Sequence, residues 1–120
     1  MMFFDLFRRE PNLQTVPTGE FLFREGEATN ELMYVLVAGR AEIYVGQTKV
    51  EDAQAGTILG EMAMIDQAPR SASVRAVSDC EFAEINRKRF HFLVTEAPSF
   101  ATDVMRVMAE RLRNCDRMLK

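Results

Sequence analysis

Apolar and polar residues alternate in short runs as far as residue 85, and turn-forming residues interrupt these runs about every ten positions. Short strands with this spacing are typical of a β-sandwich or β-barrel. The strand candidates are 21–24, 32–37, 41–45, 48–51, 57–59, 72–77 and 81–85. Ahead of them, residues 3–9 are expected to form a short helix that Pro11 stops. The pattern therefore predicts a mainly β protein with flanking helices.

The pattern changes to a helical period after Ile85. Asn86 is a suitable N-cap, and the apolar residues that follow it keep helical spacing up to Pro98. Ser99 can cap a second helix, and neither Gly nor Pro occurs between residues 100 and 120. The sequence therefore predicts two C-terminal helices.

The second of these helices carries an apolar seam of the coiled-coil type. Its members are spaced by 4, 3, 4, 3 and 4 residues: Ala101, Met105, Met108, Leu112, Cys115 and Leu119. A second stripe, formed by Phe100, Val104 and Val107, lies beside the seam in the first half of the helix. Two apolar faces allow the helix to pack on its own β-domain and on a second copy, so a homodimer through residues 99–119 is expected. One broad face buried within a single chain is the alternative.

Composition and charge narrow the class of protein. A chain of 120 residues with 48% apolar and 28% charged residues fits one folded globular domain. Its 15 basic and 18 acidic side chains give a net charge of -3, which argues against a general nucleic-acid binder. The N-terminus lacks the positive region of a secretory signal, and no apolar stretch is long enough for a membrane span. We expect a cytoplasmic protein with reduced thiols and no membrane partner.

Most metal and covalent chemistry is excluded by residue counts. One histidine and two distant cysteines cannot form a four-ligand zinc site, an iron–sulfur cluster or a Cys–His catalytic pair with an orienting group. No base, nucleophile and orienting residue converge in the sequence, so an enzyme is not expected. The sequence predicts neither a metal site nor a cofactor.

The segment between residues 60 and 72 carries the candidate binding chemistry. Residues 61–66 favour one short helical turn, whose free N–H groups attract an anion. Gly60 before the turn allows a ligand to approach the backbone closely. Arg70 has a planar guanidinium that suits a phosphate, and Ser71 adds a hydroxyl donor. These residues together predict a site for one small phosphate group.

Glu61 is unexpected at such a site because a carboxylate repels a phosphate. Its presence is explained if the ligand also carries a hydroxyl donor, such as a ribose 2′-OH. In the alternative interpretation, Glu61 caps the short helix and Arg70 forms a surface ion pair with Asp66 or a neighbour. The residues alone leave both interpretations open.

The run from Leu59 to Met64, followed after five residues by the run from Arg70 to Ala76, resembles the phosphate-binding cassette of the cyclic nucleotide-binding domain family. Upstream, residues 23–27 and 33–41 resemble the first signature of that family, in which glycines turn the strands of the barrel. Thr29 stands where a smaller residue is more usual. No position of the cassette motif departs from the pattern.

The resemblance extends from about Thr15 to Arg113 and implies a fold. That fold is an eight-stranded antiparallel jelly roll, or double-stranded β-helix, with a short N-terminal helix, a cassette helix and two C-terminal helices. The chain is then one domain. Residues 1–12 form its N-terminal helical segment, residues 13–85 its β-roll with the cassette at 59–76, and residues 86–120 its C-terminal helices.

The same resemblance implies a set of binding residues. The implied ribose contacts are Gly60 and Glu61, and the implied phosphate contacts are Arg70, Ser71 and the backbone N–H groups near Ala63 and Ala72. The base would lie against apolar barrel side chains and beneath the last helix. The nominated base contacts are Met62, Val74, Met108, Arg111 and Leu112.

The residue after the cassette arginine bears on the base. Threonine there often accompanies cyclic GMP in this family, whereas Ser71 resembles the cyclic AMP receptors among bacterial regulators. Cyclic AMP is therefore favoured, and cyclic GMP stays open.

The expected function is that of a stand-alone cyclic nucleotide sensor that signals to an unknown protein effector through movement of its C-terminal helix. The chain resembles the sensor half of catabolite activator-type bacterial regulators and stops where their helix-turn-helix domain would begin, so no DNA-binding domain is expected in it. The sequence fits a natural short protein as well as a piece of a longer one. The alternative function is a protein interaction or dimerisation module that keeps the fold and has lost nucleotide binding.

Overall fold

The computed structural model of the chain describes residues 7, 10 and 12–118. The strands are β1 (Leu13–Val16), β2 (Phe21–Phe23), β3 (Met33–Ala38), β4 (Ala41–Val45), β5 (Thr48–Ala53), β6 (Ile58–Leu59), β7 (Ser73–Ala76) and β8 (Cys80–Ile85). The helices are the 3-10 turn η1 (Glu61–Met64), α2 (Arg87–Glu96) and α3 (Ser99–Met118). Apart from Phe7, the helix expected over residues 3–9 lies outside the described residues.

The strands form two antiparallel four-stranded sheets, with the orders β1-β8-β3-β6 and β2-β7-β4-β5. Strands pair from the ends of the series inward, β1 with β8, β2 with β7, β3 with β6 and β4 with β5. This nested pairing is the topology of a jelly roll, so the expected fold class is confirmed. The pattern does not predict β1, in which only Val16 is buried.

Strand β3 separates two apolar cores because both of its faces are covered. Tyr34 and Leu36 point between the two sheets, where they pack with buried residues from both. Met33 and Val35 point to the opposite face of their sheet, which η1, α2 and α3 cover. Burial on both faces explains the nearly continuous apolar run of this strand.

Helix α2 begins at the predicted cap, where the Asn86 side chain accepts a hydrogen bond of 2.7 Å from the Arg89 N–H. The helix ends before Pro98, as predicted. Its first residue also reaches the turn η1, because the Arg87 guanidinium donates to the carbonyls of Met64 (3.1 Å) and Ala63 (3.2 Å). The start of α2 is thereby bonded to the end of η1.

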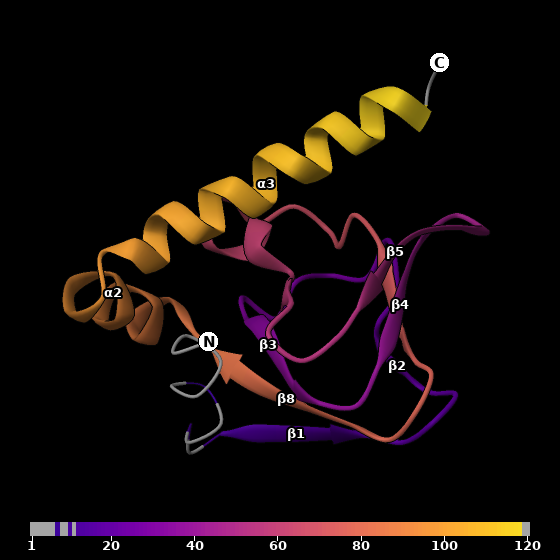
Figure 1. Ribbon diagram of the computed structural model, residues 1–120, viewed down its shortest axis with the longest axis horizontal. Helices are drawn as coiled ribbons and strands as arrows, with labels where there is room; N and C mark the ends of the chain where they lie inside the picture. The colour runs from indigo at the N-terminus through magenta and orange to yellow at the C-terminus, as the bar shows by residue number, and fades with distance from the viewer. Residues whose placement is uncertain (1–6, 8–9, 11, 119–120) are drawn as a thin grey trace.

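Helix α3 runs past η1 at one end of the β-roll and extends beyond it (Figure 1). Phe100 and Val104 are buried in the core on the helix side, and this confirms that the predicted stripe packs on its own β-domain. The seam beside it is only partly covered by the described residues, since Met108 packs against the core while Met105 is 60% and Leu112 is 66% exposed. The described part of the chain therefore leaves some of the seam open.

Candidate functional site

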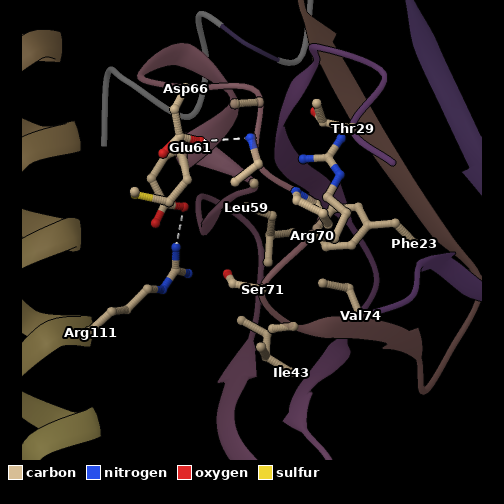
Figure 2. Close-up of a pocket in the computed structure, with 16 residues that line it drawn as sticks. Phe23, Thr29, Ile43, Leu59, Glu61, Asp66, Arg70, Ser71, Val74 and Arg111 are labelled. Atoms are coloured by element: carbon tan, nitrogen blue, oxygen red, sulfur yellow. Dashed lines mark hydrogen bonds and ion pairs between the residues drawn. The ribbon is translucent and has the colours of Figure 1, made fainter. Parts of the chain in front are cut away.

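A cavity of about 150 Å³ lies between the second sheet, η1 and α3 (Figure 2). Most of the segment from Leu59 to Ala72 lines it, together with side chains from β2, β4 and β7 and Arg111 from α3. A second hollow of about 470 Å³ shares Ile43 with the first and continues along β5 to Cys115 near the end of α3. The cassette residues predicted from the sequence thus lie at a concave site.

Gly60 shapes the start of the turn η1. Its φ of 69° lies in the left-handed region, which favours glycine. A Cβ at this position would lie 2.7 Å from Nη1 of Arg70. Glycine is therefore required here both by the backbone and by the close approach of a guanidinium.

Arg70 is a buried cation, only 7% exposed. Its Nη2 donates to Asn30 Oδ1 (2.6 Å) and to the Leu32 carbonyl (2.9 Å), and its guanidinium lies over the Phe23 ring at 4.2 Å. Burial lowers the pKa of Arg70 because desolvation disfavours its charge. Both hydrogen-bond acceptors are neutral, and no carboxylate among the described residues forms an ion pair with Arg70. The positive charge of Arg70 is therefore not paired with a carboxylate of the described residues.

The surface interpretation of these residues is wrong. Arg70 is not at the surface, and Asp66 Oδ1 instead accepts a hydrogen bond of 3.0 Å from the Ala68 N–H. The hydrogen bond that the Glu61 side chain accepts within the described part of the chain comes from Arg111 and not from a backbone N–H of η1. Neither half of that alternative is present in the structure.

Glu61 is only 5% exposed and forms an ion pair with Arg111 of α3. Arg111 Nη1 donates to Glu61 Oε1 at 2.5 Å, while Nε and Nη2 donate to the two carboxylate oxygens of Glu51 on β5 at 2.9 and 3.1 Å. Arg111 Nη2 also donates to the Ile58 carbonyl at 2.6 Å. Burial lowers the pKa of Arg111, but the hydrogen bonds and charges of the two carboxylates outweigh this effect, so its pKa is raised.

The structure gathers most of the predicted site residues at the first cavity. Those that line it are Gly60, Glu61, Met62, Ala63, Arg70, Ser71, Ala72, Val74 and Arg111. The Ala63 N–H, however, donates to the Gly60 carbonyl at 3.1 Å, so it would have to leave the turn to contact a phosphate.

Two of the residues nominated for the base do not line the cavity. Met108 packs against the core on the helix side, and Leu112 points to solvent. The reason is the helical period, because on α3 only the face of Arg111 is turned toward the cavity.

Three side chains of the site were not predicted. Phe23 and Asn30 contact Arg70, and Glu51 contacts Arg111. Asn30 and Glu51 are 40 and 60 positions from their partners in the sequence. Only the fold brings such residues together, so no local pattern indicates them.

The chain belongs to the cyclic nucleotide-binding domain family, whose pattern matches residues 13–97. It is 34% identical over 80 residues to a cAMP-dependent protein kinase regulatory subunit of Emericella nidulans, a match over 65% of this chain and 19% of that protein. It is 32% identical over 96 residues to a cyclic nucleotide-gated potassium channel of Rhizobium etli, covering 80% of this chain and 26% of the channel. The chain thus spans about a fifth to a quarter of the length of these curated relatives.

Solved structures of larger proteins share the fold. The catabolite activator protein of Thermus thermophilus matches with a TM-score of 0.77 and 25% identity, over 98% of this chain and 55% of that one. An EAL enzyme in its cAMP-bound form matches with a TM-score of 0.63 and 31% identity, over 88% of this chain and 29% of that one. The fold therefore occurs in a catabolite activator protein and also in an enzyme. Among the described residues of the present chain, no helix is long and apolar enough to cross a bilayer.

Proposed function

We propose that this protein is a cyclic nucleotide sensor that binds cyclic AMP, in preference to cyclic GMP, in the cavity beside η1. The observation that carries the proposal is Arg70, a buried guanidinium with only neutral acceptors around it. A buried charge is costly unless it is paired. A cyclic phosphate at this point of the cavity would supply the missing negative charge, and Gly60 leaves room for the guanidinium that would bind it.

The sugar would bind at Glu61. Arg111 contacts one of the two carboxylate oxygens of this residue, and the other can accept a hydrogen bond from a ribose 2′-OH. Ser71 lines the same cavity and can donate its hydroxyl to the phosphate. Figure 2 shows Glu61 and Arg70 on different sides of the cavity, with Ser71 below both in this view, which fits a ligand carrying both groups.

The base would extend into the second hollow. Its wall combines apolar side chains, Ile43 and Val50, with the polar Asn114 of α3. A purine needs an apolar surface for its face and polar groups for its edge, so this composition suits it. The preference for cyclic AMP rests on Ser71 and is the part of the proposal that a direct comparison of the two nucleotides decides.

The signal would leave the site through α3. Arg111 joins this helix to the cassette through Glu61, so a ligand at Glu61 alters a contact that positions the helix. We infer that ligand binding shifts α3 over the cavity, changes a homodimer formed through residues 99–119, and presents the result to a protein effector. No catalytic step is part of this function.

Calorimetric titration with cyclic AMP and cyclic GMP tests the proposal. The matched variants are Arg70→Ala and Arg75→Ala, because Arg75 is exposed on β7 and does not line the cavity. Arg70→Ala should cost about 2 to 5 kcal/mol of binding, since a ligand phosphate loses its buried charge partner. Arg75→Ala should bind like the unchanged protein.

Two outcomes contradict the proposal. An Arg70→Ala protein that folds and binds within about threefold of the original, less than about 1 kcal/mol, would remove Arg70 from the site. No heat with either nucleotide at millimolar concentration would favour the interaction module without a ligand.

A further inference from the structure

We propose that Glu51 determines the selectivity of the site for a ribose over a 2′-deoxyribose ligand, although Glu51 itself does not contact the sugar. The inference rests on the proposed function and concerns the guanidinium that Glu51 shares with Glu61. Glu51 comes from β5, outside the cassette. It would act as a positioning residue through Arg111.

The geometry of Arg111 divides its donors between two acids. Nε and Nη2 form the side of the guanidinium that faces both oxygens of Glu51, at 2.9 and 3.1 Å. Nη2 is also occupied by the Ile58 carbonyl at 2.6 Å. Because the guanidinium is planar and its donors are fixed relative to one another, only Nη1 is directed at Glu61. Glu61 is therefore contacted through Oε1 alone.

Because Arg111 contacts Glu61 through Oε1 alone, Oε2 of Glu61 has no ion-pair partner among the described residues. A carboxylate oxygen in this position is a strong acceptor for a hydroxyl of a ligand. The structure thus assigns each acid a separate task. Glu51 takes the two-point contact with Arg111, and Glu61 keeps one oxygen for the sugar.

Loss of the Glu51 charge would change this division. Arg111 would then have one carboxylate partner, and paired contacts between a guanidinium and a carboxylate are favoured over single ones. The guanidinium would turn to engage both oxygens of Glu61. A ribose 2′-OH would have to compete with Arg111 for its acceptor, whereas a 2′-deoxy sugar would lose nothing.

Because a change at Glu51 also changes the net charge beside the cavity, the informative measurement is the ratio of the affinities for the two sugars and not the affinity for one ligand. Arg111 with Glu51 and Glu61 has a net charge of one negative unit, counted from the three side chains of the cluster. Neutralising Glu51 removes a negative charge near the cavity and so favours any phosphate ligand, whatever its sugar. That effect is the same for both sugars and cancels in the ratio of their dissociation constants.

The test compares the dissociation constants of cyclic AMP and 2′-deoxy-cyclic AMP for the full chain and four variants. Glu51→Gln removes the charge with little change of shape, and Glu51→Ala removes every acceptor. Asp52→Asn is the matched control, because Asp52 is the exposed neighbour that pairs with Lys49. Glu51→Asp restores the carboxylate.

The unchanged protein and Asp52→Asn are expected to prefer the ribose ligand by about ten- to a hundredfold, as one hydrogen bond to a charged group predicts. Glu51→Gln and Glu51→Ala should reduce this ratio to about threefold or less, and Glu51→Asp should restore most of it. A purely structural role would weaken both ligands equally and leave the ratio unchanged, and that result overturns the inference. A failure of the proposed function is distinct, because the unchanged protein would then bind neither nucleotide.

Discussion

Gly60 is the residue on which the geometry around Arg70 depends. Its positive φ starts η1, and its missing Cβ allows the Arg70 guanidinium to lie where a methyl group would come within 2.7 Å of Nη1. Gly46 has a similar φ of 62° with no atom within 4 Å of a built Cβ. A substitution at either glycine would strain the backbone, but only a substitution at Gly60 would also displace the guanidinium.

Gly60→Ala and Gly46→Ala form a matched pair. Each should lose about 1 to 2 kcal/mol of stability, because an L-residue is strained in the left-handed region. Only Gly60→Ala should also displace Arg70 and weaken cyclic AMP binding at least tenfold. Thermal unfolding gives the first quantity and calorimetric titration the second. If Gly60→Ala bound cyclic AMP as tightly as Gly46→Ala does, Arg70 would not need its observed position.

Much of the site could be predicted at this scale because its chemistry is local in the sequence. Glu61, Arg70 and Ser71 stand within one short segment and carry the groups that a sugar and a phosphate require. Glu51 and Asn30 were not predictable, because an acid in a strand and an amide in a loop have no distinctive meaning until the fold places them beside an arginine.

At the scale of elements, the strand and helix order was largely predictable. β3 and β4 have strong apolar patterns, and α2 begins and ends at standard signals. β1 was missed because it is an edge strand with only one buried residue, so its sequence lacks a clear alternation. Of the three base contacts nominated on α3, Arg111 lines the cavity and Met108 and Leu112 do not, because the seam and the cavity-facing side are adjacent in the helical period.

The exposed seam of α3 gives a prediction about this element. Leu112→Glu places a charge where two helices would meet, and it should convert a dimer into a monomer without unfolding the domain, since Leu112 is 66% exposed. Thr102→Glu is the control, an exposed position of the same helix that lies outside the seam. Sedimentation measures the oligomeric state of both variants. A protein that is monomeric before any substitution would refute the dimer.

At the scale of the whole molecule, the proposed function gives α3 a part in both nucleotide binding and dimerisation, and any coupling between these two equilibria is reciprocal. The dimer dissociation constant should change on saturation with cyclic AMP, by about 5- to 150-fold if the coupling is typical. The affinity for cyclic AMP should differ by the same factor between dimer and monomer. Sedimentation with and without nucleotide gives the first factor, and titration of the unchanged protein against Leu112→Glu gives the second. A dimer constant that ignores the nucleotide would disprove signalling through α3.

The two arginines that reach η1 from successive helices have a consequence for how the molecule opens. Arg87 of α2 bonds to carbonyls at the end of the turn, and Arg111 of α3 bonds to Glu61 at its start. A turn of four residues by itself would open at almost no cost in free energy, like an ordinary surface loop. Here the turn cannot open without breaking contacts to both helices, so η1, α2 and α3 belong to one cooperative unit of local unfolding. We therefore expect hydrogen exchange at the backbone amides of this short turn to be as slow as the local unfolding of the two helices allows.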